Sequence, residues 1–217
     1  RYTLNEIAGY LKQRFGHPNV FSFATSCTAS AQALLAATHT LANGFSPRAL
    51  VLGFESFNHL TFEHFHAMHL LAEQADGLPF LDAGGMILGE AAACVALASQ
   101  PTATVCRIRG AIGQTDFDSL TASSSDALHQ LIAACLQQAG LRPADIGAIK
   151  THASGGGSDT METEVLHRLL PHAPAILFKP HTGHTLGASA ALETALLWQA
   201  MHAPALPELP HPSVRLP

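Results

Sequence analysis

Twice along the chain, a short apolar run passes through a polar turn into a helix rich in alanine, and each turn holds a reactive side chain. In the first unit, Asn19–Phe23 leads to Cys27 and a helix over 29–41; in the second, Ala175–Lys179 leads to His184 and a helix over 186–201. A short apolar run is typical of a buried strand, and small side chains let a helix pack closely against it. The repeat therefore predicts an α/β protein with helices on sheets.

The rest of the chain continues this alternation of strands and helices. The patterns predict helices over 4–15, 61–71, 125–140 and 160–170, strands over 48–54 and 148–152, a loop over 75–85, an extended tail from 203, and a hairpin of two long strands, 86–97 and 104–112. Ser125 and Asp126 are the expected caps of the helix that ends near Gly140.

Composition excludes several functional classes. Hydrophobic residues make up 47% of the 217 residues and charged residues 12%, which is typical of a well-packed globular protein. The net charge of −5 argues against nucleic acid as the main partner. The four cysteines form no CxxC pair, so they predict neither a disulfide framework nor a cysteine–zinc site, and a reducing cytoplasm fits best. No apolar run is long enough to cross a membrane, and the first residues show no signal-peptide pattern.

Cys27 is the first candidate for chemistry. It sits where the apolar run turns into a helix, so its thiol faces the free N–H groups and the positive end of the helix dipole. This position favours the thiolate, which is the nucleophilic form. The alternative is a small buried residue without chemical function.

Three later stretches carry further candidates. His152 ends a strand and opens a glycine loop, an arrangement in which active sites of α/β sheets collect, and the loop does not fit the nucleotide-binding glycine motifs. Asp159 and Glu162 start a helix, where a simple N-cap is the alternative. Lys179 and His184 flank a glycine turn, and a histidine at a helix N-terminus tends to stay neutral and to donate a hydrogen bond.

The other histidines are weaker candidates. His64, His66 and His69 share one predicted helix, but the first two point to different faces, so we expect surface histidines rather than a metal site.

Taken together, these stretches resemble the β-ketoacyl-[acyl carrier protein] synthases, the condensing enzymes of fatty-acid and polyketide synthesis. The segment from Thr25 to Ser30 resembles the nucleophile motif T-A-C-[AS]-[ST]-[SG]. His152-Ala153-Ser154-Gly155 resembles H-G-T-G, and Asp159-x-x-Glu162 resembles the D-x-x-E that follows it. The segment from Lys179 to Ala188 is very close to K-S-x-x-G-H-x-x-G-A. Weaker matches are Val51–Ser56, to a strand with G-G-x-E-A, and Gly89–Ala92, to G-E-G-A.

The resemblance implies a thiolase-like fold, an α-β-α-β-α layered sandwich of two related halves, here residues 1–113 and 114–217. It implies that Cys27 takes an acyl chain from acyl carrier protein and that its own N–H helps to bind the oxyanion. His152 and His184 would stabilise the enolate formed when malonyl-carrier protein loses carbon dioxide. Lys179 and Glu162 would form a supporting charged pair, and Asp159 would hold the loop. No metal and no diffusible cofactor is implied.

The departures from the family pattern concern the site's surroundings. The glycine loop after His152 is one residue shorter, and Met86 stands where an acyl-pocket phenylalanine is usual, so chain-length preference stays open. The chain is about half as long as a typical member. It lacks the opening strands and the closing N-x-F-G-F-G-G-T-N segment, which carries the second oxyanion donor. We therefore expect a partial chain with little condensing activity alone.

Two functional readings remain. The first is a discrete synthase that works as a homodimer or heterodimer and performs a decarboxylative Claisen condensation; the segment Glu55–Glu63 resembles synthases of aryl-polyene clusters. The second is a non-catalytic partner of the chain-length-factor kind, although such partners usually lack the cysteine. A thiolase or a type III synthase would need a Cys-His-Asn or Cys-His-Cys set, which is not visible around His184.

Overall fold

The computed structural model describes residues 6–73, 84–100, 106–115 and 124–202. Its helices and strands are α1 (Glu6–Phe15), α2 (Ala29–Ala42), β1 (Arg48–Glu55), α3 (His59–Ala67), β2 (Ala91–Ala98), α4 (Ser125–Ala139), β3 (Ile149–Lys150), α5 (Ser158–Leu169), β4 (Ala175–Ile176), α6 (Lys179–Thr182) and α7 (Ser189–His202), with 3₁₀ turns η1 (Ser26–Thr28), η2 (Pro143–Asp145) and η3 (Leu186–Ala188). Most of the predicted loop over 75–85 and the predicted tail from 203 lie outside the described residues.

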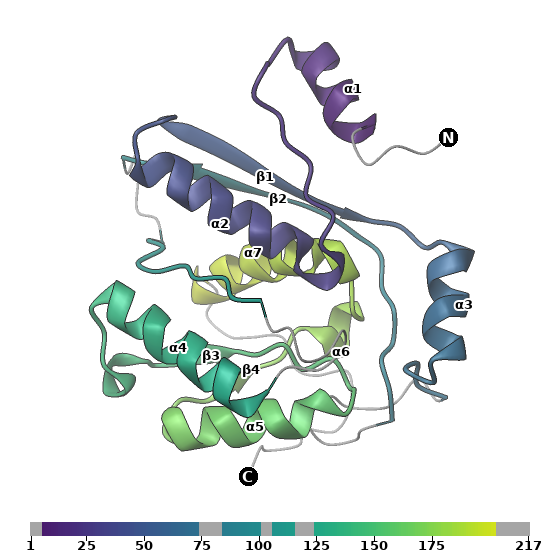
Figure 1. The fold of residues 1–217 in the computed structure, drawn as a ribbon, viewed down its shortest axis with the longest axis vertical. Coiled ribbons are helices and arrows are strands. Elements are labelled where there is room, and N and C mark those ends of the chain that lie inside the picture. The colour runs from purple at the N-terminus through teal and green to yellow at the C-terminus, as the bar shows by residue number, and fades with distance from the viewer. Residues whose placement is uncertain (1–5, 74–83, 101–105, 116–123, 203–217) are drawn as a thin grey trace.

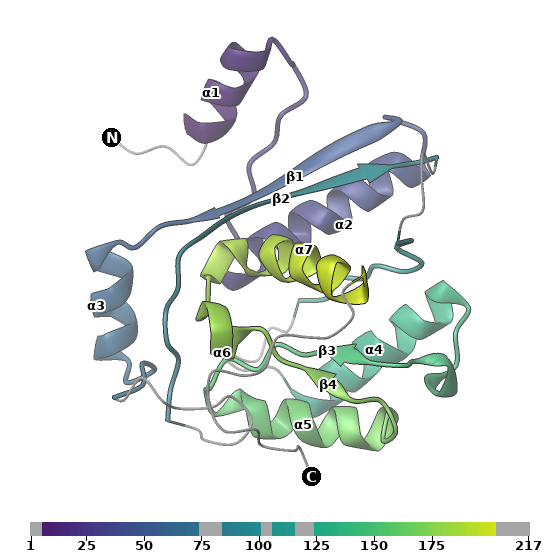
Figure 2. The same cartoon turned by 180° about the vertical axis from the view of Figure 1, so that it is seen from behind.

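Four layers follow one another through the body of the molecule (Figures 1 and 2). The β1–β2 sheet packs on the central helices α2 and α7, the β3–β4 pair lies beyond them, and α4 and α5 cover its far side. Helix α1 stands away from this body, joined to it by residues 16–25. The alternation predicted from the sequence is thus realised as α/β layers.

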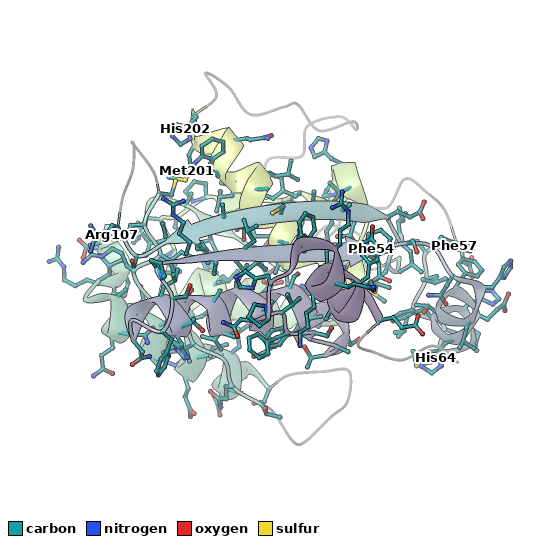
Figure 3. The ribbon with its side chains drawn as sticks, turned by 90° about the horizontal axis from the view of Figure 1, so that it is seen from above. Phe54, Phe57, His64, Arg107, Met201 and His202 are labelled. Atoms are coloured by element: carbon teal, nitrogen blue, oxygen red, sulfur yellow. The ribbon has the colours of Figure 1, made fainter. Side chains whose placement is uncertain are left out.

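The β1–β2 sheet differs from the expected pairing. Strand β2 runs antiparallel to β1, and residues 106–112 form no strand, so the predicted hairpin between 86–97 and 104–112 is wrong. The register is consistent with the pairing of β2 with β1. Leu50 faces Ala96, Leu52 faces Cys94 and Phe54 faces Ala92, so large apolar side chains of β1 lie opposite small ones of β2. The inner face packs on α2 and α7, whereas Leu50, Leu52 and Phe54 are exposed. Phe54 is labelled in Figure 3.

The predicted strand over 19–23 is also wrong. Residues 18–25 have no regular structure, and Phe21 is 76% exposed. A strand needs a neighbour to accept and donate its backbone hydrogen bonds, and the described part of the chain places none beside this segment. The strands predicted over 148–152 and 175–179 shrink to two residues each, because the chain turns early into the loops that carry His152 and Lys179.

Helix boundaries follow the capping chemistry. The Oγ atom of Ser124 accepts a hydrogen bond from the N–H of Ala127 at 3.1 Å, so Ser124, and not Ser125 or Asp126, caps α4. Gly140 ends the helix in the left-handed conformation with φ of 64°.

Each of the two alanine-rich helices follows a 3₁₀ turn, and together turn and helix form a repeated unit. In each, a residue with positive φ opens a 3₁₀ turn that leads directly into a helix of 14 residues: Ser26 before α2, and Leu186 before α7. Cys27 and Gly187 hold the same place in the two turns. The turns η1 and η3 pack together, and so do α2 and α7, where the N–H of Ala191 donates to Oγ of Ser30 at 3.2 Å.

Candidate active site

Cys27 lies in η1, immediately before the N-terminus of α2. The turn is closed by a hydrogen bond from the N–H of Thr28 to the carbonyl of Thr25 at 3.2 Å, and Ser26 has φ of 53°. The thiol is half-buried. Burial raises the pKa of the Cys27 thiol, while a hydrogen bond from Ser26, its own backbone N–H and the charge of Lys179 oppose this increase. The predicted position at a helix start is therefore confirmed, whereas the strand expected before it is absent.

His152 is held through its backbone by Glu162. The carboxylate of Glu162 accepts the N–H of His152 at 2.6 Å and that of Ala153 at 2.9 Å. These bonds stabilise a turn in which Ala153 has φ of 43°, a conformation that costs free energy for a residue with a Cβ atom. Glu162 thus orients the histidine from α5 by binding its main chain.

Asp159 holds the glycine loop in a similar way. Its carboxylate accepts the N–H of Ser154 at 3.0 Å and that of Gly155 at 2.9 Å. Gly155 has φ of 88°, and a Cβ atom there would lie 2.4 Å from the carbonyl oxygen of Gly85, so glycine is required. The simple N-cap alternative for Asp159 is wrong, since Gly157 is the N-cap of α5.

Lys179 has a different partner from the one expected. Its ammonium donates to Oε1 of Glu193 at 2.7 Å and to the carbonyl of His152 at 2.5 Å. Among the described residues Glu193 on α7, and not Glu162, forms the ion pair with Lys179, so that pairing is corrected. Glu162 is already occupied by backbone N–H groups, although its charge still acts on Lys179. The other oxygen of Glu193 binds Lys150, at the end of β3.

Sequence reasoning missed Glu193 and Lys150, although a signal for both existed. Glu193 is the one acidic residue in an alanine- and leucine-rich helix, and Lys150 follows two apolar residues at the end of a short strand. A charge inside an apolar segment indicates a buried ion pair, because an unpaired charge is costly to bury.

His184 lies almost fully buried beside His152. Only 1% of it is exposed, and the two imidazole rings stand nearly perpendicular with their centres 5.2 Å apart. The backbone N–H of His184 donates to the carbonyl of Ile87. The ring atom Nδ1 of His184 lies 3.2 Å from Oγ of Ser189 at the start of α7. The predicted proximity of His184 to a helix N-terminus is confirmed.

Both imidazoles are held neutral. Burial lowers the pKa of His152 to about 3, and the positive charges of Lys179 and Lys150 add to the effect. Burial also lowers the pKa of His184 to about 3, again with help from Lys179. A neutral imidazole keeps one ring N–H, so it can donate a hydrogen bond to an oxygen that gains negative charge.

The thiol joins this group through the packing of η1 on η3. A Cβ atom on Gly187 would lie 3.5 Å from the carbonyl oxygen of Ser26, so the two turns touch beside Cys27. Glu55, at the end of β1, accepts the N–H of Gly187 at 3.0 Å and ties the first half of the chain to the second. Residues from both repeated units therefore converge on one place.

The remaining predicted residues lie around this place or away from it. Met86 forms a bridge with Leu71, and its part in an acyl pocket stays a prediction. A surface pocket beside η3 is lined by Glu55, Phe57, Leu88, Glu90 and Leu186 among others. In the described ranges, no three histidine, cysteine or acidic side chains are grouped as metal ligands would be, and none of the helices there is long and apolar enough to cross a membrane.

Two family models match this chain. Residues 3–103 match the family model described as beta-ketoacyl synthase, N-terminal domain, and residues 105–212 match beta-ketoacyl synthase, C-terminal domain. The chain belongs to the β-ketoacyl synthase family. The two matched regions follow one another along the chain.

Two curated relatives extend this result. The chain is 29% identical to 3-oxoacyl-[acyl-carrier-protein] synthase 2 of Rhizobium meliloti (strain 1021). The alignment is 230 positions long, and it covers 94% of this chain and 54% of the relative. The chain is also 28% identical over 186 residues to Nodulation protein E of Rhizobium sp. (strain N33). This alignment covers 80% of this chain and 46% of the relative. The synthase chain thus spans about half the length of the curated relatives it matches.

Solved structures show the same fold. The ketosynthase ApeO, in complex with its chain length factor ApeC from Xenorhabdus doucetiae, matches with a TM-score of 0.85 and 26% identity over 92% of this chain and 51% of that chain. A beta-ketoacyl synthase from Burkholderia phymatum STM815 matches with a TM-score of 0.72 and 25% identity over 82% of this chain and 47% of that one. The thiolase-like fold is therefore confirmed, for a chain about half as long as its neighbours.

Proposed function

We propose that the chain carries the central catalytic groups of a β-ketoacyl-[acyl carrier protein] synthase. The observation that supports this most directly is the pair of neutral imidazoles, the exposed His152 and the buried His184, whose rings are 5.2 Å apart, together with a thiol at a helix N-terminus. A thiol there suits acyl transfer, and neutral imidazoles suit an enolate. Residues 1–113 and 114–217 are assigned to the two halves of such an enzyme.

Acyl transfer comes first. The Cys27 thiolate attacks the carbonyl carbon of an acyl thioester on the carrier protein, and the carrier thiolate leaves as the new thioester forms. The tetrahedral intermediate carries its charge on oxygen, and the backbone N–H of Cys27 is one donor to it. No cofactor takes part in this step.

Condensation follows on the acylated enzyme. Malonyl-carrier protein loses carbon dioxide, and the electron pair of the broken C–C bond passes into an enolate whose oxygen accepts hydrogen bonds from His152 and His184. Because Ser189 lies at Nδ1 of His184, its hydroxyl can donate there and leave Nε2–H as the donor to the enolate. The enolate carbon then attacks the acyl carbon on Cys27, and the sulfur leaves as thiolate.

The charged residues behind the histidines keep them in place. Lys179 binds the carbonyl of His152, Glu162 binds its N–H, and Asp159 shapes the loop after it. In this proposal none of the three contacts substrate, and Met86 is assigned to the acyl pocket.

The partner is an acyl carrier protein in the cytoplasm, and the synthase acts as a homodimer or heterodimer. The likeness to ApeO, whose structure is a complex with a chain length factor, supports a heterodimer. The aryl-polyene-type pathway rests on the resemblance of the segment Glu55–Glu63. A non-catalytic chain-length-factor role is the second candidate, and the presence of Cys27 and both histidines argues against it.

The deciding experiment follows acylation of Cys27. The chain is incubated with an acyl-carrier protein, and the modified peptide is located by mass spectrometry, with Cys135→Ser as the matched control for the other half-buried thiol. We expect acylation at Cys27 in the wild type and in the control, and none in Cys27→Ser. No acylation of Cys27 would overturn the catalytic proposal in favour of the partner role.

A further inference from the structure

The thiolate of Cys27 needs stabilisation that the histidines do not supply. Burial raises the pKa of the thiol, and the two nearby imidazoles are neutral, so neither offers a positive charge to a thiolate. Besides the backbone N–H of Cys27, the charged groups acting on the sulfur are Lys179 from α6, which favours the thiolate, and Glu55 from β1, which opposes it. A group beside the sulfur is therefore needed to offset part of the free-energy cost of burying the thiolate.

Ser26 is placed to meet it. Its Oγ atom lies 3.9 Å from Sγ of Cys27, and among the described residues it is the one side-chain group within hydrogen-bond reach of that sulfur. A hydroxyl can rotate its hydrogen toward an anion, and a hydrogen bond to a charged acceptor is stronger than one between neutral groups.

The backbone fixes the hydroxyl in this position. Ser26 adopts φ of 53°, in the left-handed region that is unfavourable for a residue with a side chain. The packing of Gly187 against the carbonyl of Ser26 holds the turn in place. The family's nucleophile motif has alanine at this position, so the hydroxyl is a feature of this chain rather than of the shared motif.

We propose that the Ser26 hydroxyl is a hydrogen-bond donor that stabilises the Cys27 thiolate. The donor acts before acyl transfer, when the sulfur is anionic, and again when condensation expels the sulfur as thiolate. This inference rests on the proposed function of Cys27 as the nucleophile.

The test measures thiolate formation directly and needs no turnover. The rate of Cys27 alkylation by iodoacetamide is followed by peptide mass spectrometry from pH 6 to pH 10.5 in the wild type, Ser26→Ala and Ser26→Gly. Exposed Cys94 in each sample provides the reference rate. We expect both variants to react about three- to ten-fold more slowly than the wild type near pH 7.5, and the difference to shrink toward the alkaline end, where a larger share of the thiol is ionised.

The two variants separate the hydroxyl from the backbone. Alanine removes the hydroxyl and keeps the strained turn, whereas glycine removes the hydroxyl and relieves the strain. Ser22→Ala, an exposed serine in the preceding segment, is the matched control and should leave the profile unchanged. A wild-type profile in Ser26→Ala, or a change in Ser26→Gly alone, would overturn the proposal. Loss of acyl transfer with a normal hydroxyl effect would instead overturn the proposed function.

Discussion

The Nζ atom of Lys179 lies 2.7 Å from Oε1 of Glu193, and both side chains are buried. Lys150 binds the second oxygen of the same carboxylate, so one anion joins β3, α6 and α7. Since Lys179 also holds the carbonyl of His152, the position of the histidine depends on a helix that is distant in sequence.

Glu193→Gln should destabilise the fold strongly. The substitution leaves two lysines beside a neutral amide, and removing one partner of a buried ion pair costs about 3–5 kcal/mol. Urea unfolding monitored by circular dichroism measures the loss. The control is Glu63→Gln, whose exposed carboxylate lies 3.9 Å from His59. An equal unfolding midpoint for Glu193→Gln and the wild type would show that the triad does not stabilise the protein.

Glu162→Gln should loosen the turn at His152. The amide of glutamine has one oxygen, so it can accept only weakly the two N–H bonds that the carboxylate now receives from His152 and Ala153. We expect amide hydrogen exchange at these two residues to accelerate about ten-fold or more, measured by NMR. Glu164→Gln, on the exposed side of the same helix, serves as the comparison, and unchanged exchange in Glu162→Gln would refute the role.

Stability should fall as the pH drops from about 6.5 toward 3. The folded pKa of His184 is about 3, lowered from the model-peptide value of 6.5, so within this window the unfolded chain binds the proton and the folded chain does not. The stabilisation is complete above pH 6.5 and is lost toward the folded pKa. In His184→Asn, the free energy of unfolding should therefore decline less steeply between pH 6.5 and 4.5. His59→Asn, an exposed control, should follow the wild type, and parallel curves for His184→Asn would contradict the assignment.

The outer face of the β1–β2 sheet should drive self-association. Leu50 is 72% exposed, Leu52 53% and Phe54 61%, and alternation along the strand places all three on one face. The double variant Leu50→Lys and Leu52→Lys should reduce the apparent mass in light scattering at high concentration. Leu60→Lys, at an 82% exposed leucine on α3, is the control. If it reduces association equally, the sheet face is not the cause.

Local patterns predicted the helices more accurately than they predicted the strands. Alanine-rich periodicity placed α2, predicted over 29–41 and found over Ala29–Ala42. A helix satisfies its hydrogen bonds within itself, whereas a strand depends on a neighbour. For that reason the apolar run at 19–23 failed to form a strand, and β2 paired with β1 instead of with the next apolar run.

The charge network behind the histidines could not be read from spacing alone. Glu162 was expected to bind Lys179, but its carboxylate faces backbone N–H groups that any residue would offer. The true partner, Glu193, comes from another helix, and only the tertiary packing of α7 brings it to Lys179. Sequence distance carries no information on such a contact.

The close approach of β1 to the second repeated unit also limits how this chain can evolve. A Cβ atom on Gly53 would lie 2.8 Å from Cβ of Ala191, and Ala188 is fully enclosed. A larger residue on β1 would need a smaller one on η3 or α7. In a library of single substitutions we therefore expect these positions to tolerate only the smallest residues, and tolerance of larger ones to appear only in compensated pairs between β1 and the second unit.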